Sequence, residues 1–193
     1  MINQQQEQVI EGTIEELDKW WKEATSSIFQ TGQFIHCVEI DGKSFYNGYE
    51  QYLLLNVNQI KGINIQTLSK TESILSTEQS LDEYLDRFIP GALGLADQLF
   101  GNLSAEQQQL LAQLVEGLDW IGKALQFAGT LYADSGSSLP EYADLLEPFY
   151  AFVNELFEAI NQDDYVGVAD LLQYEIVPLL ERFRNRSAKR DLS

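Results

Sequence analysis

Residues 104–132 read SAEQQQLLAQLVEGLDWIGKALQFAGTLY. Apolar residues recur in this stretch at intervals of three and four, which places them on one face of an α-helix. They are Leu111, Leu114, Leu118, Ile121, Leu125, Ala128 and Tyr132. The first four residues, Ser104-Ala105-Glu106-Gln107, have the form of a capping box. The stretch therefore predicts a long amphipathic helix.

The same spacing occurs in three further segments of the chain. One begins at the capping-box pattern Ser80-Leu81-Asp82-Glu83, and the other two follow Pro140 and Asp163-Asp164. Their apolar faces are formed by Leu81, Leu85, Phe88, Ala92, Leu95 and Leu99, by Tyr142, Leu146, Phe149, Val153, Leu156 and Ile160, and by Ala169, Leu172, Ile176, Leu179 and Phe183. Helices of about 20 residues with short loops favour an antiparallel four-helix bundle. We place this bundle at residues 76–185.

The residues before the bundle mix helical spacing with alternation. A capping-box pattern at Thr13-Ile14-Glu15-Glu16 introduces a helix with apolar residues at helical spacing. Residues 34–40 then alternate, with Phe34, His36, Val38 and Ile40 on one face of the predicted strand and Ile35, Cys37 and Glu39 on the other. Asp41-Gly42 suits a type I′ turn, so residues 34–46 predict a β-hairpin.

A short helix over residues 49–57 and a strand over residues 63–67 are expected after the hairpin. Residues 1–75 are therefore predicted to form a small α+β unit of helix, hairpin, short helix and strand. For residues 2–10 the sequence leaves two alternatives, an edge strand or a frayed terminus. The whole chain is expected to be an α+β protein, with a boundary between its two regions near residues 70–79.

Charge is distributed very unevenly along the chain. Residues 71–181 hold twenty acidic residues and two basic ones, Arg87 and Lys123, whereas the segment from residue 182 to the end holds five basic residues and Asp191. The net charge of −18 disfavours nucleic acid and anionic membrane surfaces as partners. Residues 186–193 are interpreted as a basic C-terminal tail. A single cysteine and the absence of a spanning or targeting segment lead us to expect a cytoplasmic protein.

No pattern typical of an enzyme or a cofactor site stands out. His36 and Cys37, the only histidine and the only cysteine, are adjacent and would point to opposite faces of a strand. The acidic pairs Glu155 and Glu158, and Asp82 and Asp86, lack a calcium-loop context. We therefore expect no catalytic residue, no metal and no cofactor.

Prolines and glycines interrupt the predicted helices. Pro90, Pro148 and Pro178 can curve a helix, break it into two helices or open a groove, and for Pro148 a helix start is a further alternative. Six glycines fall in the same helices, either because two backbones pack closely there or because a gap is left for a ligand. They are Gly91, Gly94, Gly117, Gly122, Gly129 and Gly167.

Several aromatic residues fall outside the predicted core positions and suggest a second apolar surface. The residues that we predict to bind a partner are Trp20, Tyr49, Trp120, Tyr150 and Phe157. Such a surface would contact a foreign protein, the other region of the same chain, or a second copy in a homodimer.

Three functional hypotheses follow from the sequence. The first is a non-enzymatic protein-interaction module, an adaptor or chaperone-like protein that binds a partner polypeptide. The second is an acidic mimic of nucleic acid that binds a DNA-binding protein. The third is a hydrolase whose chemistry depends on carboxylates alone.

Overall fold

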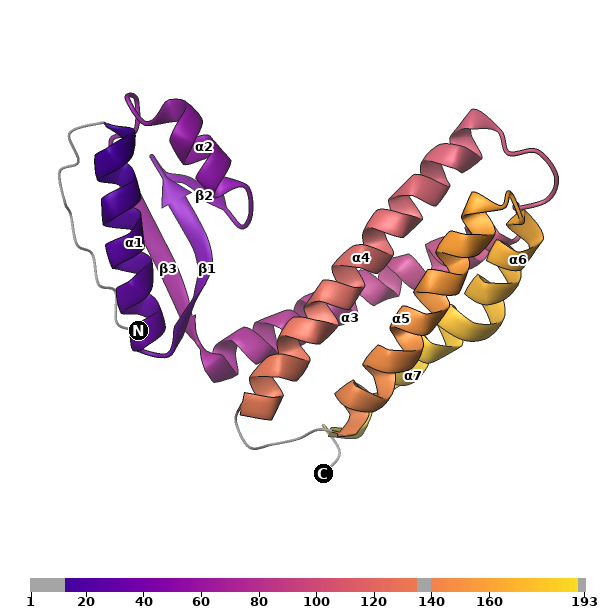
Figure 1. The fold of residues 1–193 in the computed structure, drawn as a ribbon. Helices are drawn as coiled ribbons and strands as arrows, with labels where there is room; N and C mark the ends of the chain where they lie inside the picture. The colour runs from indigo at the N-terminus through magenta and orange to yellow at the C-terminus, as the bar shows by residue number, and fades with distance from the viewer. Residues whose placement is uncertain (1–12, 135–139, 191–193) are drawn as a thin grey trace. The chain divides into compact units, whose positions relative to one another are not determined.

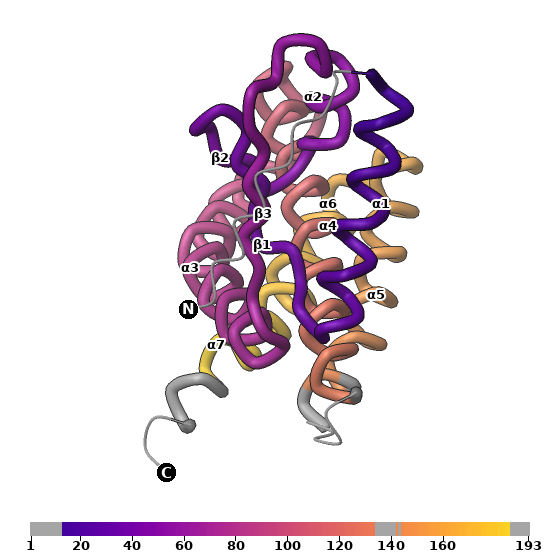
Figure 2. Tube along the Cα trace, turned by 90° about the vertical axis from the view of Figure 1, so that its left-hand side faces the viewer, coloured from indigo at the N-terminus to yellow at the C-terminus, as the bar shows by residue number. Residues whose placement is uncertain are grey.

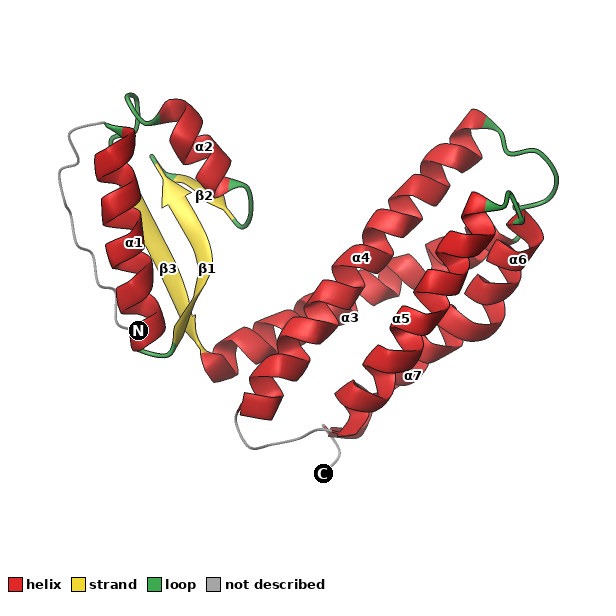
Figure 3. Cartoon of the chain, in the orientation of Figure 1, coloured by secondary structure: helices red, strands yellow, loops and turns green. Residues whose placement is uncertain are grey.

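The computed structural model describes residues 13–134 and 140–190 of the 193-residue chain. Helices predominate, and the strands in these ranges form a three-stranded antiparallel sheet (Figures 1, 2 and 3). The chain is therefore an α+β protein, as its sequence predicts. Its contacts divide it into two compact units, Met1–Leu75 and Ser76–Ser193.

The first unit contains every element predicted within the described part of its sequence. The elements are α1 (Ile14–Gln30), β1 (Gln33–Ile40), β2 (Lys43–Phe45), α2 (Tyr49–Asn56) and β3 (Ile63–Ser69). Strand β1 lies in the middle of the sheet, antiparallel to both neighbours, so α2 carries the chain across it from β2 to β3 (Figure 3). Both helices pack on the face that carries Val38 and Ile40, where Leu17 and Leu53 complete the core. The edge strand considered for residues 2–10 lies outside the described residues.

The hairpin turn has the predicted backbone conformation. Asp41 and Gly42 have φ angles of 50° and 82°, the left-handed region that a type I′ turn requires. Asp41 has a second role, because its Oδ1 accepts hydrogen bonds from the backbone N–H groups of Lys61 at 2.9 Å and Gly62 at 2.8 Å. One aspartate thus turns the hairpin and anchors the start of β3.

The predicted alternation along β1 is wrong at its first half. Ile35 pairs with Thr67 and Cys37 pairs with Gln66, so His36 is an extra residue in a β-bulge. An extra residue inverts the alternation. Ile35, rather than His36, therefore packs with the core of Val38 and Ile40.

The described residues of the second unit form helices and the loops between them, with no strand. Its elements are α3 (Lys70–Ala96), which begins in the first unit, α4 (Ala105–Asp134), α5 (Pro140–Asn161), α6 (Tyr165–Asp170), the π-helical segment η1 (Leu171–Ile176) and α7 (Val177–Arg190). Helices α4 and α5 pack against each other, and α5 also contacts α6, η1 and α7 (Figures 1 and 2). The predicted apolar faces meet in one core, whose fully buried side chains include Leu81, Leu85, Leu118, Ile121, Leu125, Phe149, Leu156, Leu172 and Ile176.

Helix α3 begins about three turns earlier than the sequence predicts. The capping box that starts it joins Ser69 and Glu72. The Ser69 N–H donates to Glu72 Oε2 at 2.8 Å, and the Glu72 N–H donates to Ser69 Oγ at 3.3 Å. The predicted cap, Ser80, instead donates its hydroxyl to the Ser76 carbonyl at 2.8 Å inside the helix. Residues 70–79, which we expected to separate two regions, are therefore helical.

The other predicted helix starts are confirmed. Thr13 Oγ1 accepts from the Glu16 N–H at 3.3 Å, and Asp164 Oδ1 accepts from the Gly167 N–H at 2.9 Å. At α4 the capping box is reciprocal, because Gln107 Oε1 accepts from the Ser104 N–H at 2.8 Å and Ser104 Oγ accepts from the Gln107 N–H at 3.2 Å. Side-chain caps of this kind satisfy N–H groups that a helix leaves unpaired.

The three prolines expected to interrupt helices lie within helices, and Pro140 begins α5. Pro90 is inside α3 and Pro148 is inside α5, so the alternative that a helix begins at Pro148 is wrong. Pro178 is the second residue after η1, and at the end of η1 the Val177 N–H donates to the Leu172 carbonyl five residues earlier. Since proline lacks an N–H and its ring crowds the carbonyl four residues before it, Pro178 accounts for the wider turn. Helix α7 extends to Arg190 and includes residues 186–190 of the predicted tail.

Candidate interaction groove between helices α3 and α4

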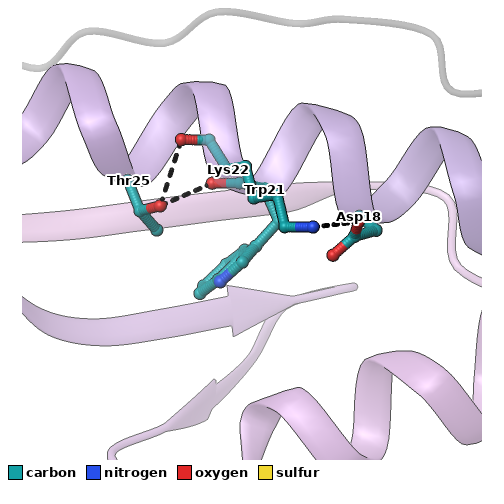
Figure 4. Close-up of polar contacts among 4 residues, drawn as sticks. All are labelled: Asp18, Trp21, Lys22 and Thr25. Atoms are coloured by element: carbon teal, nitrogen blue, oxygen red, sulfur yellow. Dashed lines mark hydrogen bonds and ion pairs between the residues drawn. The ribbon is translucent and has the colours of Figure 1, made fainter.

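The predicted partner-binding residues of the first unit lie at the edge of its own core. Trp20 and Trp21 lie with ring centroids 6.1 Å apart, and Trp21 lies 5.4 Å from Tyr49. Trp21 points from α1 toward the sheet, while Asp18 and Lys22 form a 2.6 Å ion pair on the helix surface (Figure 4). Burial and the charge of Glu50 raise the pKa of Tyr49. Trp20 and Tyr49 are half-buried by these intramolecular contacts.

The three predicted residues of the second unit belong to two different helix pairs. The Trp120 ring packs against Tyr84 of α3, with centroids 4.7 Å apart. Tyr150 of α5 faces α4 instead, where its hydroxyl lies 3.2 Å from the position that a Cβ on Gly122 would take. Phe157 lies two turns farther along α5. Each of the three remains exposed by 39–40%.

Five of the six helical glycines fall into two groups, those that meet a neighbouring helix and those that face open space. Gly167 belongs to neither group, because a Cβ there would overlap Asp164, the cap of its own helix. A Cβ on Gly117 would lie 2.5 Å from Tyr84 Oη and 2.8 Å from the Phe88 ring, so α3 and α4 can approach there only because Gly117 has no side chain. Gly122 receives the side chains of Phe149 and Tyr150 of α5, which lie 3.2 Å from the position of its Cβ, whereas a Cβ on Gly129 would meet α5 only at ordinary contact distances of 3.5 Å or more. In contrast, nothing lies within 4 Å of a Cβ on Gly91 or Gly94.

Gly91 and Gly94 open onto a hollow of about 410 Å³ between α3 and α4, which we call the α3–α4 groove. Pro90 directly precedes Gly91 in the chain. Leu110, 37% exposed, lies across from the two glycines. The groove is lined by Tyr84, Arg87, Phe88, Gly91, Ala92, Gly94, Leu95, Gln98, Leu110, Gln113 and Leu114. Apolar side chains and bare glycine backbone therefore make up most of its wall.

One end of the α3–α4 groove is fastened by hydrogen bonds. Gln98 Nε2 donates to the Gly94 carbonyl at 2.7 Å within α3. The carbonyl of Gln98 in turn accepts from Gln107 Nε2 of α4 at 2.7 Å. Because Gln107 also closes the capping box of α4, the same side chain fixes the helix start and ties it to the end of α3.

A second hollow, of about 530 Å³, lies where the α3–α4 and α5–α6 loops meet. Asn102, Gln108, Asp163 and Tyr165 contribute its polar wall. The Tyr165 hydroxyl donates to Asp163 Oδ1 at 2.8 Å, and this bond raises the pKa of Tyr165. An open hollow of this composition offers few apolar surfaces to a partner.

The residues considered for catalysis or metal binding are dispersed. Burial, together with the charge of Glu39, raises the pKa of the Cys37 thiol, while His36 lies edge-on to Tyr46 at 5.4 Å. Asp86 pairs with Arg184 at 3.3 Å. Within residues 13–134 and 140–190, no three histidine, cysteine, aspartate or glutamate side chains form a cluster that could hold a metal ion.

The sequence-based interpretation missed a polar cluster centred on Glu78. Glu78 Oε1 accepts hydrogen bonds from the hydroxyls of Tyr142 at 2.8 Å and Tyr132 at 3.2 Å. The carboxylate therefore links α3 to α4 and α5. The sequence did indicate such a cluster, because both tyrosines occupy predicted core positions and a buried tyrosine hydroxyl needs a hydrogen-bond partner.

Comparison with known families identifies the second unit. The family model described as "Domain of unknown function (DUF8042)" matches residues 76–186. No solved structure matches the chain. None of the described helices is both long and apolar enough to cross a membrane. Because the family match covers more than half of the 193 residues, the chain belongs to the DUF8042 family.

Proposed function

We propose that the second unit is a non-enzymatic protein-interaction module whose α3–α4 groove binds a helix of a partner polypeptide. The observation that carries this proposal is the open space at Gly91 and Gly94 beside the exposed Leu110. Large apolar side chains of a partner would fill that space and remove the surrounding apolar surface from water.

We further infer that α3, α4, α5 and the continuous segment from α6 to α7 form an antiparallel four-helix bundle. Their apolar faces share one core, and their connections are short. In such a bundle consecutive helices are antiparallel neighbours, and the contacts of Tyr84 with Trp120 and of Gln98 with Gln107 agree with that placement of α3 beside α4. A ligand helix can then lie in the seam between them.

The length of the α3–α4 groove suits a helix. Its lining on α3 extends from Tyr84 to Gln98, which corresponds to about 21 Å at 1.5 Å per residue. A partner helix of about four turns covers this length. At one end of the groove the ring of Tyr84 packs against the exposed Trp120, so the apolar surface continues beyond the groove in the same direction.

A module of this kind would act as an adaptor or a chaperone-like protein. Its contribution would be to cover the apolar face of an amphipathic partner helix until that partner assembles or is released. No chemical step is assigned to it.

The test fills the groove without disturbing the core. A Cβ at Gly91 or Gly94 would meet no other atom within 4 Å apart from its chain neighbours and the backbone of its own helix, so Gly91→Leu and Gly94→Leu introduce their side chains without a clash at the Cβ. The control, Ala112→Leu, introduces the same side chain at an exposed position of α4 outside the groove lining. Each tagged protein is purified from its native host and bound polypeptides are identified by mass spectrometry.

We expect the wild-type protein and Ala112→Leu to retain one polypeptide at near-stoichiometric amounts, and Gly94→Leu to lose it. Retention of that polypeptide by both glycine variants, or recovery of the wild-type protein with no polypeptide bound, would contradict the proposed function.

A further inference from the structure

Arg87 is the one charged residue among the described residues that line the α3–α4 groove. It is an exposed residue of the groove lining. Residues 71–181 contain one other basic residue, Lys123, and Lys123 pairs with Asp119 at 2.7 Å. Arg87, by contrast, makes no ion pair and no hydrogen bond with the residues that the structure describes.

A partner that fills the groove also covers the guanidinium of Arg87 and displaces water from it. Arg87 carries five N–H donors in a planar fork, and it lies beside Phe88 in the lining. Covering it with an apolar surface would remove its water without replacing the hydrogen bonds, which is costly. A carboxylate of the partner would accept two of these bonds in a bidentate pair. The groove therefore favours an occupant that brings an acidic residue to Arg87.

The surroundings of the groove favour the opposite charge. Glu83 lies one turn before Arg87 on α3, and Glu106 lies one turn before Leu110 on α4. Both are exposed, as is Glu116 on α4. With twenty acidic residues between positions 71 and 181, the unit repels a second acidic surface and attracts a basic one. A second copy of this unit is therefore disfavoured as the occupant.

Resting on the proposed function, we propose that the α3–α4 groove binds a positively charged amphipathic helix that carries one carboxylate at the edge of its apolar face, and that Arg87 selects this helix by pairing with the carboxylate. The apolar face covers Gly91, Gly94 and Leu110. The basic residues of the helix face Glu83, Glu106 and Glu116.

The probe is a displayed library of helical peptides of about 16 residues, long enough for four turns. Apolar residues are fixed at helical spacing, and the remaining positions vary among Lys, Glu, Gln, Ser and Ala. The library is selected separately on the full-length wild-type protein, on Arg87→Glu and on Gly94→Leu. Circular dichroism verifies that each variant is folded.

On the wild-type protein we expect enrichment of peptides with a net positive charge and a Glu at one fixed distance from the apolar positions. On Arg87→Glu the same position should be enriched in Lys. Gly94→Leu should enrich neither set, because its new side chain occupies the groove.

Affinity measurements on one selected synthetic peptide provide the quantitative test. Replacing its fixed Glu by Gln should weaken binding about 10-fold, as expected for the loss of a charge-assisted pair. Arg87→Glu should weaken binding of the original peptide by at least that factor and restore binding of the Glu-to-Lys peptide. Lys123→Glu is the matched control, because it reverses the other cation of the region outside the groove, and it should leave the affinity within about 2-fold.

Two results would overturn the inference, and they are distinguishable. If peptides depend on Gly94 but show no preference for Glu, or if Arg87→Glu enriches the same peptides, the role of Arg87 is wrong and the proposed function stands. If no enriched peptide depends on Gly94, both the inference and the proposed function are wrong.

Discussion

Glycines of α3 and α4 have two opposite effects on the packing of these helices. At Gly117 the absence of a Cβ lets Tyr84 and Phe88 pack against α4, whereas at Gly91 and Gly94 it leaves the α3–α4 groove open. The sequence identified these glycines but could not sort them into two groups. Which glycine meets a neighbour depends on how two helices align, and helical spacing alone does not fix that alignment.

Substitution by alanine should therefore have opposite effects at two of these positions. Gly94→Ala should raise the free energy of unfolding by about 0.5–1 kcal/mol, because alanine favours a helix interior and the new methyl meets no atom. Gly117→Ala should lower it by about 1–3 kcal/mol, because the methyl would overlap Tyr84 and Phe88. Chemical denaturation measures both, and effects of the same sign would contradict the assignment.

The carboxylate of Glu78 should also be important for stability. Glu78→Ala removes the 2.8 Å hydrogen bond between the carboxylate and the hydroxyl of Tyr142, a residue only 2% exposed. We expect a loss of about 1–3 kcal/mol in the free energy of unfolding. Glu147→Ala, at an exposed position of α5, is the control and should change it by no more than about 0.5 kcal/mol. Equal effects of the two substitutions would show that the cluster does not stabilise the fold.

Among the elements, helices were easier to predict than their boundaries. The caps at Thr13, Ser104 and Asp164 are confirmed. The start of α3 was wrong because two capping-box patterns, at Ser69 and at Ser80, lie close together and the local sequence does not show which one is used. The bulge at His36 leaves no mark in the alternation, so the faces of β1 could not be predicted correctly either.

The cap of α3 should respond to pH in a defined direction. Hydrogen bonds from Ser69 lower the pKa of the Glu72 carboxyl below its usual value. A lowered pKa in the folded state means that the capping contribution is fully present above the unfolded pKa and is lost as the pH falls through the folded pKa. NMR titration should show the Ser69 amide signal moving with this carboxyl. In Glu72→Gln, which can retain the cap, the signal should not titrate in that range.

For the whole molecule, the sequence predicted the α+β class and the charge distribution but not a continuous helix at residues 70–79. The first turns of this helix should affect the stability of fragments of the chain. A fragment that begins at Ser69 keeps the capping box and Glu78, and should be as helical and as stable as the second unit of the full chain. A fragment that begins at Ser80 lacks both. It should unfold at a lower denaturant concentration, and equal stability of the two fragments would contradict this role for the first turns of α3.

The aromatic residues that first suggested a binding function do not line the proposed binding site. Trp20 and Tyr49 pack within the first unit, and Tyr150 packs on α4. The α3–α4 groove instead combines the gaps at Gly91 and Gly94 with the charge of Arg87. Such a site depends on two neighbouring helices, so no single stretch of sequence displays it.

The most direct measurement is photocrosslinking in the native host. A photoreactive amino acid replaces Leu110 in the groove or, as a control, Glu147 on α5. We expect one crosslinked polypeptide from position 110, joined through a basic amphipathic helix, and none from position 147. The absence of an adduct at position 110, or the same adduct from both positions, would contradict the central claim that the α3–α4 groove binds a partner.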